Sequence, residues 1–128
     1  MALRGGDTFQ AADRKREEHL WIILSDPENY PEAPVLIANL TTQRADSDSA
    51  CMLARGDHPF IKHDSCVNYQ DSRLAEAQTL AGALAAKLLV AREPVSADVL
   101  QRIRIGATVS RFIPLRNLQL LKDQALVE

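Results

Sequence analysis

The order of apolar and polar positions predicts two strands in the first third of the chain. Residues 19–25 (HLWIILS) and 34–40 (PVLIANL) are short, nearly continuous apolar runs. Such runs are typical of strands that are covered on both faces or rolled into a barrel. The connection DPENYPEAP contains three prolines. Because proline has no backbone N–H and a fixed φ, we expect a loop there that joins two antiparallel strands.

Weaker strand signals lie on either side of this pair. Residues 50–54 (ACMLA) and the alternating residues 65–69 (SCVNY) predict two further strands. A first short strand is expected at residues 8–9. Residues 55–59 (RGDHP) combine glycine, aspartate and proline, which is the composition of a tight turn.

The second half of the chain carries helical patterns. Residues 73–91 are rich in alanine and leucine and precede the sequence REP. We therefore expect a helix there, capped by Asp71 or Ser72. Gly82 lies inside this helix and costs about 1 kcal/mol relative to alanine, so a break at that position is an alternative.

Two more helices are expected towards the C-terminus. Ser96 has the position of an N-cap, and Gly106 is well placed to end the helix that Ser96 starts. Pro114 starts the third helix. Four leucines lie on one side of that helix, at positions 115, 118, 120 and 121.

Strands followed by helices predict an α+β fold. A chain of 128 residues suits one domain, which we expect to be strand-rich over residues 1–70 and helical over residues 71–128. The expected architecture is a small curled antiparallel sheet or an SH3-like barrel, followed by two or three C-terminal helices packed on one side.

Composition and charge exclude several classes of protein. Charged residues make up 25% and the net charge is −2, so the chain is not a strongly cationic nucleic-acid coat. No apolar stretch has the length that a bilayer requires, and the N-terminus lacks the apolar run of a secretory signal. With only two cysteines, we expect a cytoplasmic protein with free thiols and no membrane association.

The densest collection of reactive side chains lies in residues 56–69 (GDHPFIKHDSCVNY) and just before them. Cys51, His58, His63 and Cys66 follow the spacing C-x6-H-x4-H-x2-C. These are residue types that zinc prefers. The spacing nevertheless lacks the close C-x2–4-C pair that marks zinc sites, and we expect neither a metal nor another cofactor.

A nucleophilic cysteine is also disfavoured in this segment. Neighbouring strand residues point to opposite faces, which would separate His63 from Cys66. We expect a tight loop and a lead-in to the next strand, with Lys62 and His63 on a concave rim. Lys62 and His63 would then either contact phosphate or be ordinary surface residues, and the sequence favours neither alternative.

Three short motifs follow one another in the order of a known family. Gly6 and Asp7 stand near the N-terminus, residues 22–25 (IILS) end one apolar strand, and residues 40–43 (LTTQ) end the next. This order resembles the MazF/PemK family of toxin endoribonucleases, and the closing NLQLLKD resembles that family's terminal helix. The resemblance covers roughly the first forty-five residues and the final dozen.

The resemblance implies an SH3-like barrel, a homodimer and metal-independent cleavage of single-stranded RNA. It places His19 where the family has its catalytic arginine, and Thr41 where the family has the hydroxyl partner. Leu20 stands in the place of the family's proline. Single-stranded nucleic-acid sites combine cations with aromatic stacking. The candidates for contacts with RNA are then Thr42, Gln43, Lys62, His63 and Tyr30.

The change from arginine to His19 decides between two functions. Histidine exchanges protons near neutral pH but lacks the fixed fork with which arginine holds a phosphate. We therefore expect a non-catalytic or degenerate module that binds RNA or an antitoxin-like protein. The alternative is an active endoribonuclease that uses His19 and Thr41, assisted by Lys62 or His63. A third reading is an enzyme unrelated to RNA that uses the histidines around GDHPF.

The basic run at residues 14–16 (RKR) precedes His19 directly. It either supplies the missing phosphate charge from a loop or forms an exposed hairpin tip with Glu17 and Glu18. We favour the exposed tip, because mixed charges at a turn are usually solvated.

Overall fold

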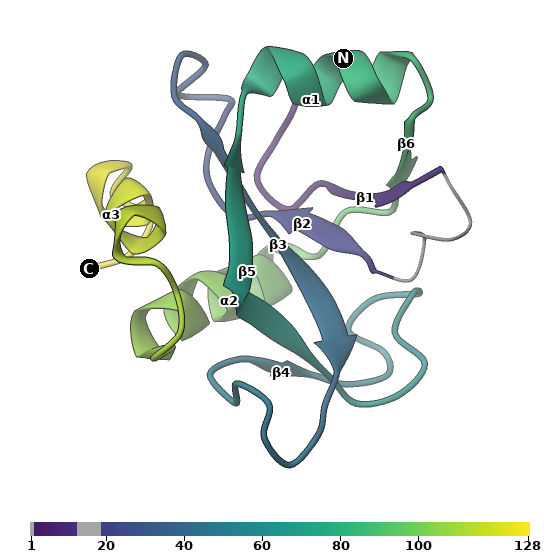
Figure 1. The fold of residues 1–128 in the computed structure, drawn as a ribbon, viewed down its shortest axis with the longest axis vertical. Coiled ribbons are helices and arrows are strands. Elements are labelled where there is room, and N and C mark those ends of the chain that lie inside the picture. The colour runs from purple at the N-terminus through teal and green to yellow at the C-terminus, as the bar shows by residue number, and fades with distance from the viewer. Residues whose placement is uncertain (1, 13–18) are drawn as a thin grey trace.

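The computed structural model describes residues 2–12 and 19–128 of the chain. Within these residues, six strands form one antiparallel sheet in the order β4-β5-β3-β2-β1-β6 (Figure 1). The elements are β1 (Thr8–Ala11), β2 (Trp21–Ile23), β3 (Val35–Thr42), β4 (Met52–Leu53), β5 (Ser65–Ala75), α1 (Ala77–Ala85), β6 (Leu89–Arg92), α2 (Ala97–Val109) and α3 (Leu115–Asp123). The sheet is curled and open, with β4 and β6 at its edges, so the α+β class is confirmed and no closed barrel forms.

Both central strands are covered on two faces, as their continuous apolar runs predict. Ile22 and Leu36 face a core that also contains residues of α2 and α3. Ile23 and Val35 face a second core, which includes Leu80 of α1. The expectation that all helices pack on one side is therefore wrong, because α1 covers the face opposite α2 and α3.

The single helix predicted over residues 73–91 is the main error of the sequence analysis. Strand β5 continues to Ala75, α1 spans only Ala77–Ala85, and Leu89–Arg92 form β6. The end of β5 pairs with the start of β3, and β6 pairs with β1. Pairing with strands far away in the sequence thus outweighs the helix propensity of alanine and leucine.

The ends of α1 also differ from the prediction. Glu76 is its N-cap, without a side-chain hydrogen bond, in place of Asp71 or Ser72. Gly82 lies within the helix and causes no break. The chain leaves the helical conformation at Lys87, whose φ of 60° belongs to the left-handed region.

Helix α2 starts as predicted and ends later than predicted. The Ser96 hydroxyl accepts a hydrogen bond of 3.2 Å from the Val99 N–H, which is N-cap geometry. Gly106 does not stop the helix, which continues to Val109. Gly106 is instead the point where α2 approaches the sheet, because a Cβ placed there would lie 2.7 Å from the Cβ of Cys51.

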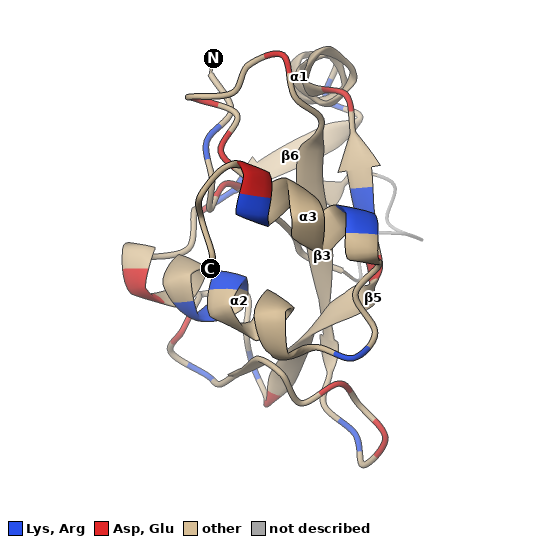
Figure 2. Ribbon diagram, turned by 90° about the vertical axis from the view of Figure 1, so that its left-hand side faces the viewer, with Lys and Arg blue, Asp and Glu red and all other residues tan. Residues whose placement is uncertain are grey.

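Helix α3 follows Pro114 as predicted, but its four leucines do not share one environment. Leu121 is fully buried, whereas Leu115 is 82% exposed. Figure 2 shows α2 and α3 in front of β3 and β5, with basic and acidic residues dispersed over them. No helix in the part of the chain that the structure describes is long and apolar enough to span a membrane.

Candidate functional site

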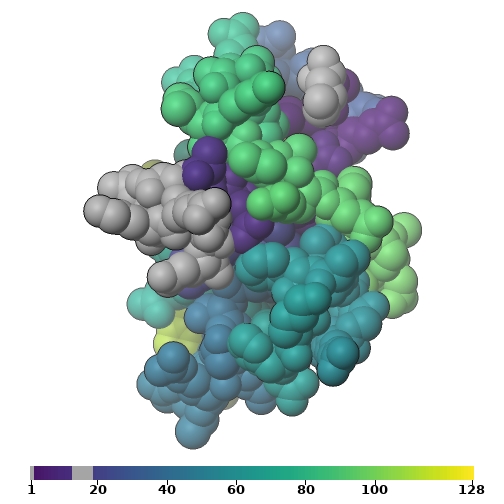
Figure 3. All heavy atoms as spheres, turned by 90° about the vertical axis from the view of Figure 1, so that its right-hand side faces the viewer, coloured from purple at the N-terminus to yellow at the C-terminus, as the bar shows by residue number. Residues whose placement is uncertain are grey.

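A cleft of about 720 Å³ lies where β2 begins and β3 ends. Its walls come from β1, His19 before β2, the end of β3 with Arg44, the loop between β4 and β5 with Ser65, and the end of β6 with Glu93. Figure 3 looks onto this side of the molecule, where the teal loop around residue 60 lies against the green segment after residue 90. Five segments that are distant in sequence therefore meet around one concave surface.

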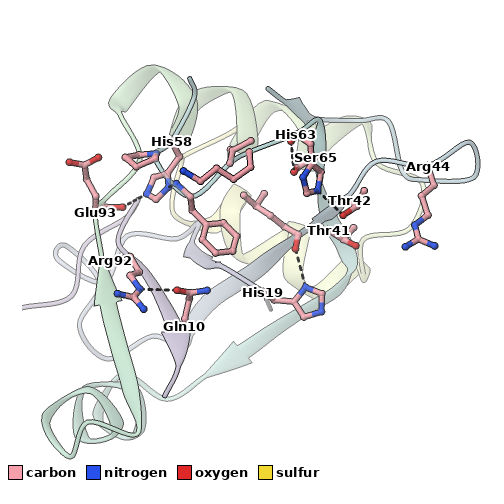
Figure 4. Close-up of a pocket in the computed structure, with 15 residues that line it drawn as sticks. Gln10, His19, Thr41, Thr42, Arg44, His58, His63, Ser65, Arg92 and Glu93 are labelled. Carbon is pink, nitrogen blue, oxygen red and sulfur yellow. Dashed lines mark hydrogen bonds between the residues drawn. The ribbon is translucent and has the colours of Figure 1, made fainter. Parts of the chain in front are cut away.

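All three histidines of the chain line this cleft (Figure 4). His19 precedes β2, and His58 and His63 belong to the loop between β4 and β5. The loop begins with the predicted turn, in which Gly56 has a φ of 105°. Glycine adopts this left-handed backbone without strain.

His19 lies beside Thr41 because β2 and β3 are antiparallel neighbours. Trp21 pairs with Asn39. In an antiparallel pair, His19, two positions before Trp21, therefore faces Thr41, two positions after Asn39. The Nδ1 atom of His19 is 3.1 Å from the carbonyl oxygen of Leu40. Because a carbonyl only accepts hydrogen bonds, Nδ1 carries the proton and Nε2 is the nitrogen that can take up a further one.

His58 is buried and uses both of its ring nitrogens. The Phe60 N–H donates to Nδ1 at 3.0 Å, and Nε2 is within hydrogen-bonding distance of the Glu93 carbonyl. One nitrogen therefore accepts and the other donates, which is the pattern of a neutral imidazole. His58 holds the loop against the end of β6 and is a positioning residue.

His63 and Thr42 form the opposite rim of the cleft. The Nε2 atom of His63 is 3.0 Å from the Thr42 hydroxyl, and both side chains are exposed. Lys62 precedes His63 in the same wall. The structure therefore brings together five of the predicted site residues, namely His19, Thr41, Thr42, Lys62 and His63.

Two predicted site residues do not line the cleft. The Gln43 N–H donates to the Asp64 carbonyl at 3.1 Å, so Gln43 joins two loops by its backbone. Tyr30 lies in the loop between β2 and β3, which is at the other end of these strands. Because the cleft lies where β2 begins, strand direction alone separates Tyr30 from it.

The cleft carries more positive than negative charge. Among the described residues that line it are the cations Arg44, Lys62 and Arg92, and the single carboxylate is that of Glu93. The Nε of Arg92 donates to the Gln10 side-chain oxygen at 2.8 Å, which fixes the guanidinium at the cleft wall. A guanidinium has five donor hydrogens, and this bond uses one of them.

Sequence reasoning missed Arg44, Arg92 and Phe60 as site residues. Arg92 was assigned to the helical region, and the only available signal was the short LVAR run before Glu93 and Pro94. Phe60 packs against the main hydrophobic core with one part of its side chain. The structure leaves it half-buried in the cleft wall, where it is the aromatic side chain of the site among the described residues.

The residues of the C-x6-H-x4-H-x2-C pattern are not arranged around a common point. Cys51 and Cys66 are both buried, and burial raises the pKa of each thiol. Within residues 2–12 and 19–128, no group of three or more histidine, cysteine or acidic side chains could hold a metal ion. The basic run at residues 14–16, with Glu17 and Glu18, lies outside the described residues.

Comparison with known proteins assigns no relative to the chain. No protein-family model matches the sequence. A search of curated proteins likewise gives no significant match.

Proposed function

We propose that this protein binds single-stranded RNA through its phosphates in the cleft, as a divergent MazF/PemK-like module. The observation that carries the proposal is the gathering of Arg44, Lys62 and Arg92 around one concave surface, which has a single carboxylate among the residues that the structure describes. Arginine and lysine are the side chains that hold phosphate oxygens most strongly. The hydroxyls of Thr41 and Thr42 add neutral partners for the same oxygens.

An aromatic side chain in the same wall supports a nucleic-acid ligand over a free phosphate. Phe60 is half-buried, and its N–H is held at 3.0 Å by the buried His58. A base can stack on such a ring without sequence preference, which contributes roughly 1–3 kcal/mol per base. The cations and this ring together form the two parts of a single-strand site.

Fluorescence anisotropy with a labelled single-stranded RNA tests the proposal. Lys62→Ala and Arg44→Ala should each weaken binding roughly threefold to tenfold and make the salt dependence shallower by about 0.7 in log–log slope. Lys122→Ala and Arg116→Ala remove the same charges from α3 and should leave affinity unchanged. Equal losses in all four variants, or no binding at low salt, would refute a phosphate site in the cleft.

Cleavage of RNA is a second candidate function, and the state of His19 favours it. Its Nδ1 is engaged with Leu40 at 3.1 Å, so Nε2 can accept the proton of a ribose 2′-OH. The 2′ oxygen then attacks the adjacent phosphate and the bond from phosphorus to the 5′ oxygen breaks. The 5′ oxygen takes up a proton from water, and His19 later returns its proton to solvent. Arg92 and Lys62 supply positive charge that would stabilise the phosphorane.

Incubation with RNA in a chelator separates the two candidates. Active protein should release fragments that end in a 2′,3′-cyclic phosphate, and His19→Gln should abolish this while RNA affinity stays within a factor of about two. Arg116→Ala serves as the matched surface control. Fragment yields that are the same for wild type and His19→Gln would leave binding as the function.

A further inference from the structure

A second hollow of about 730 Å³ adjoins the cleft. It is bounded by residues 55–59 and 61–62 of the loop before β5 and, on the other side, by Glu93, Pro94 and Ser96. His58 and Glu93 line both hollows. The two hollows therefore adjoin each other between the same two segments, the loop before β5 and the residues after β6. Figure 3 shows these two segments side by side.

The hydrogen bond from His58 to the Glu93 carbonyl marks the border between the hollows. The side chain of His58 comes from the loop, and the carbonyl of Glu93 comes from the segment after β6. Among the described residues, this is the only hydrogen bond between the two walls that joins a side chain to the backbone. His58 is 5% exposed, so this link between the two walls is buried.

The described residues that line the second hollow include the cations Arg55 and Lys62 and the carboxylates of Asp57 and Glu93. Lys62 lines both, and Arg55 is an exposed cation of the second alone. The carboxylate of Asp57 also lines the second hollow, but it is 3.2 Å from the Arg102 guanidinium and accepts a hydrogen bond from the Ala54 N–H. The charge of Asp57 is thus compensated within the protein by Arg102. Two cations, Arg55 and Lys62, then remain against one carboxylate, Glu93, among the described residues of this hollow.

We infer that the two hollows are consecutive subsites for one single-stranded polynucleotide, which passes from one to the other along the wall that contains the shared residue Lys62. The inference rests on the proposed function and specifies its ligand as an extended strand. Each hollow alone has the volume of a site for one small molecule, about 300–1,000 Å³. A mononucleotide or dinucleotide therefore fills only one of them, while a longer strand places one phosphate near Arg44 and another near Arg55.

Equilibrium binding of labelled oligouridylates of increasing length tests this inference at constant salt. Affinity should rise with length until both hollows are occupied. Arg55→Ala should weaken binding of the long oligomers roughly threefold to tenfold and leave the dinucleotide unaffected. Arg44→Ala should weaken both, and Arg111→Ala, on the connection between α2 and α3, should weaken neither.

The outcomes separate the inference from the proposed function. If oligomers bind and Arg44→Ala weakens them, but length and Arg55→Ala have no effect, the second hollow is not a subsite. If no oligomer binds, or Arg44→Ala behaves like Arg111→Ala, the proposed function fails and the inference with it. A loss for the dinucleotide in Arg55→Ala would show that the two hollows act as one small site.

Discussion

The buried imidazole of His58 is hydrogen-bonded to the main-chain carbonyl of Glu93, 35 residues further along the chain. This bond holds the loop that carries Lys62 and His63 against the end of β6, which carries Arg92. Residues from two distant segments therefore face one cleft at a fixed separation. The positions of Lys62 and Arg92 relative to each other therefore depend on this buried hydrogen bond.

His58→Leu is expected to destabilise the protein. The substitution leaves the Phe60 N–H without its partner and removes the bond to the Glu93 carbonyl, which keeps only the hydrogen bond from the Thr8 hydroxyl at 2.7 Å. An unpaired buried group costs about 1–3 kcal/mol. Urea unfolding should show this loss in the free energy of unfolding. His63→Leu removes an exposed imidazole and should change it by no more than about 0.5 kcal/mol; equal losses in both variants would argue against the positioning role.

Gly106→Ala and Gly82→Ala should change stability in opposite directions. At Gly106 an added Cβ would meet the Tyr69 hydroxyl and lie 2.7 Å from the Cβ of Cys51, so overpacking should cost about 1–3 kcal/mol. At Gly82 nothing lies within 4 Å of an added Cβ, and alanine should stabilise α1 by about 0.5–1 kcal/mol. Thermal unfolding of both variants measures the pair. A neutral Gly106→Ala would show that α2 can move away from the sheet.

Alkaline pH should weaken the fold through three buried acids. Burial raises the pKa of the Tyr69 phenol, with a smaller effect from Cys51, and burial raises the pKa of the Cys51 and Cys66 thiols. In the unfolded chain these groups ionise near their usual values of 10.0 and 9.0, so the unfolded state then binds fewer protons than the folded one. Stability is therefore intact below about pH 9 and falls as pH rises further.

Urea unfolding at a series of pH values measures this fall, and the two tyrosines offer a matched comparison. Tyr69→Phe removes one of the three groups and should make the fall shallower. It should also lower stability at neutral pH by about 1 kcal/mol, because the phenol donates to the Ile103 carbonyl at 2.6 Å. Tyr30→Phe, at an exposed loop position, should retain the wild-type profile. Identical profiles for all three proteins would contradict the burial effect.

Arg92→Ala should weaken RNA binding more than Arg92→Lys does. The alanine variant loses a cation from the cleft, which should cost roughly threefold to tenfold in affinity. Lysine keeps the charge but cannot form a fork that holds both Gln10 and a phosphate, so we expect an intermediate loss. Filter binding at two salt concentrations measures both variants, with Arg116→Ala as control. Unchanged affinity in Arg92→Ala would remove β6 from the site.

The positions of β2 and β3 were predicted well, because burial on both faces determines where these strands lie in the sequence. Residues 19–25 and 34–40 contain β2 and most of β3, because apolar side chains on consecutive positions must be covered on both faces. Ser96 and Pro114 marked their helix starts by local chemistry, which needs no distant partner. The sequence also singled out His19, Thr41 and Lys62, which the structure places around one cleft.

What the sequence by itself determined is the α+β class and the local boundaries, because apolar pattern, capping and turn residues act over a few positions. The tertiary structure alone decided that Leu89–Arg92 form an edge strand and that Arg92 joins His19 and Lys62. The tertiary structure also decided that Gly106 lies in close contact with Cys51 and Tyr69, and that Tyr30 does not line the cleft. Each of these depends on a partner that is distant in sequence, and no local pattern carries that information.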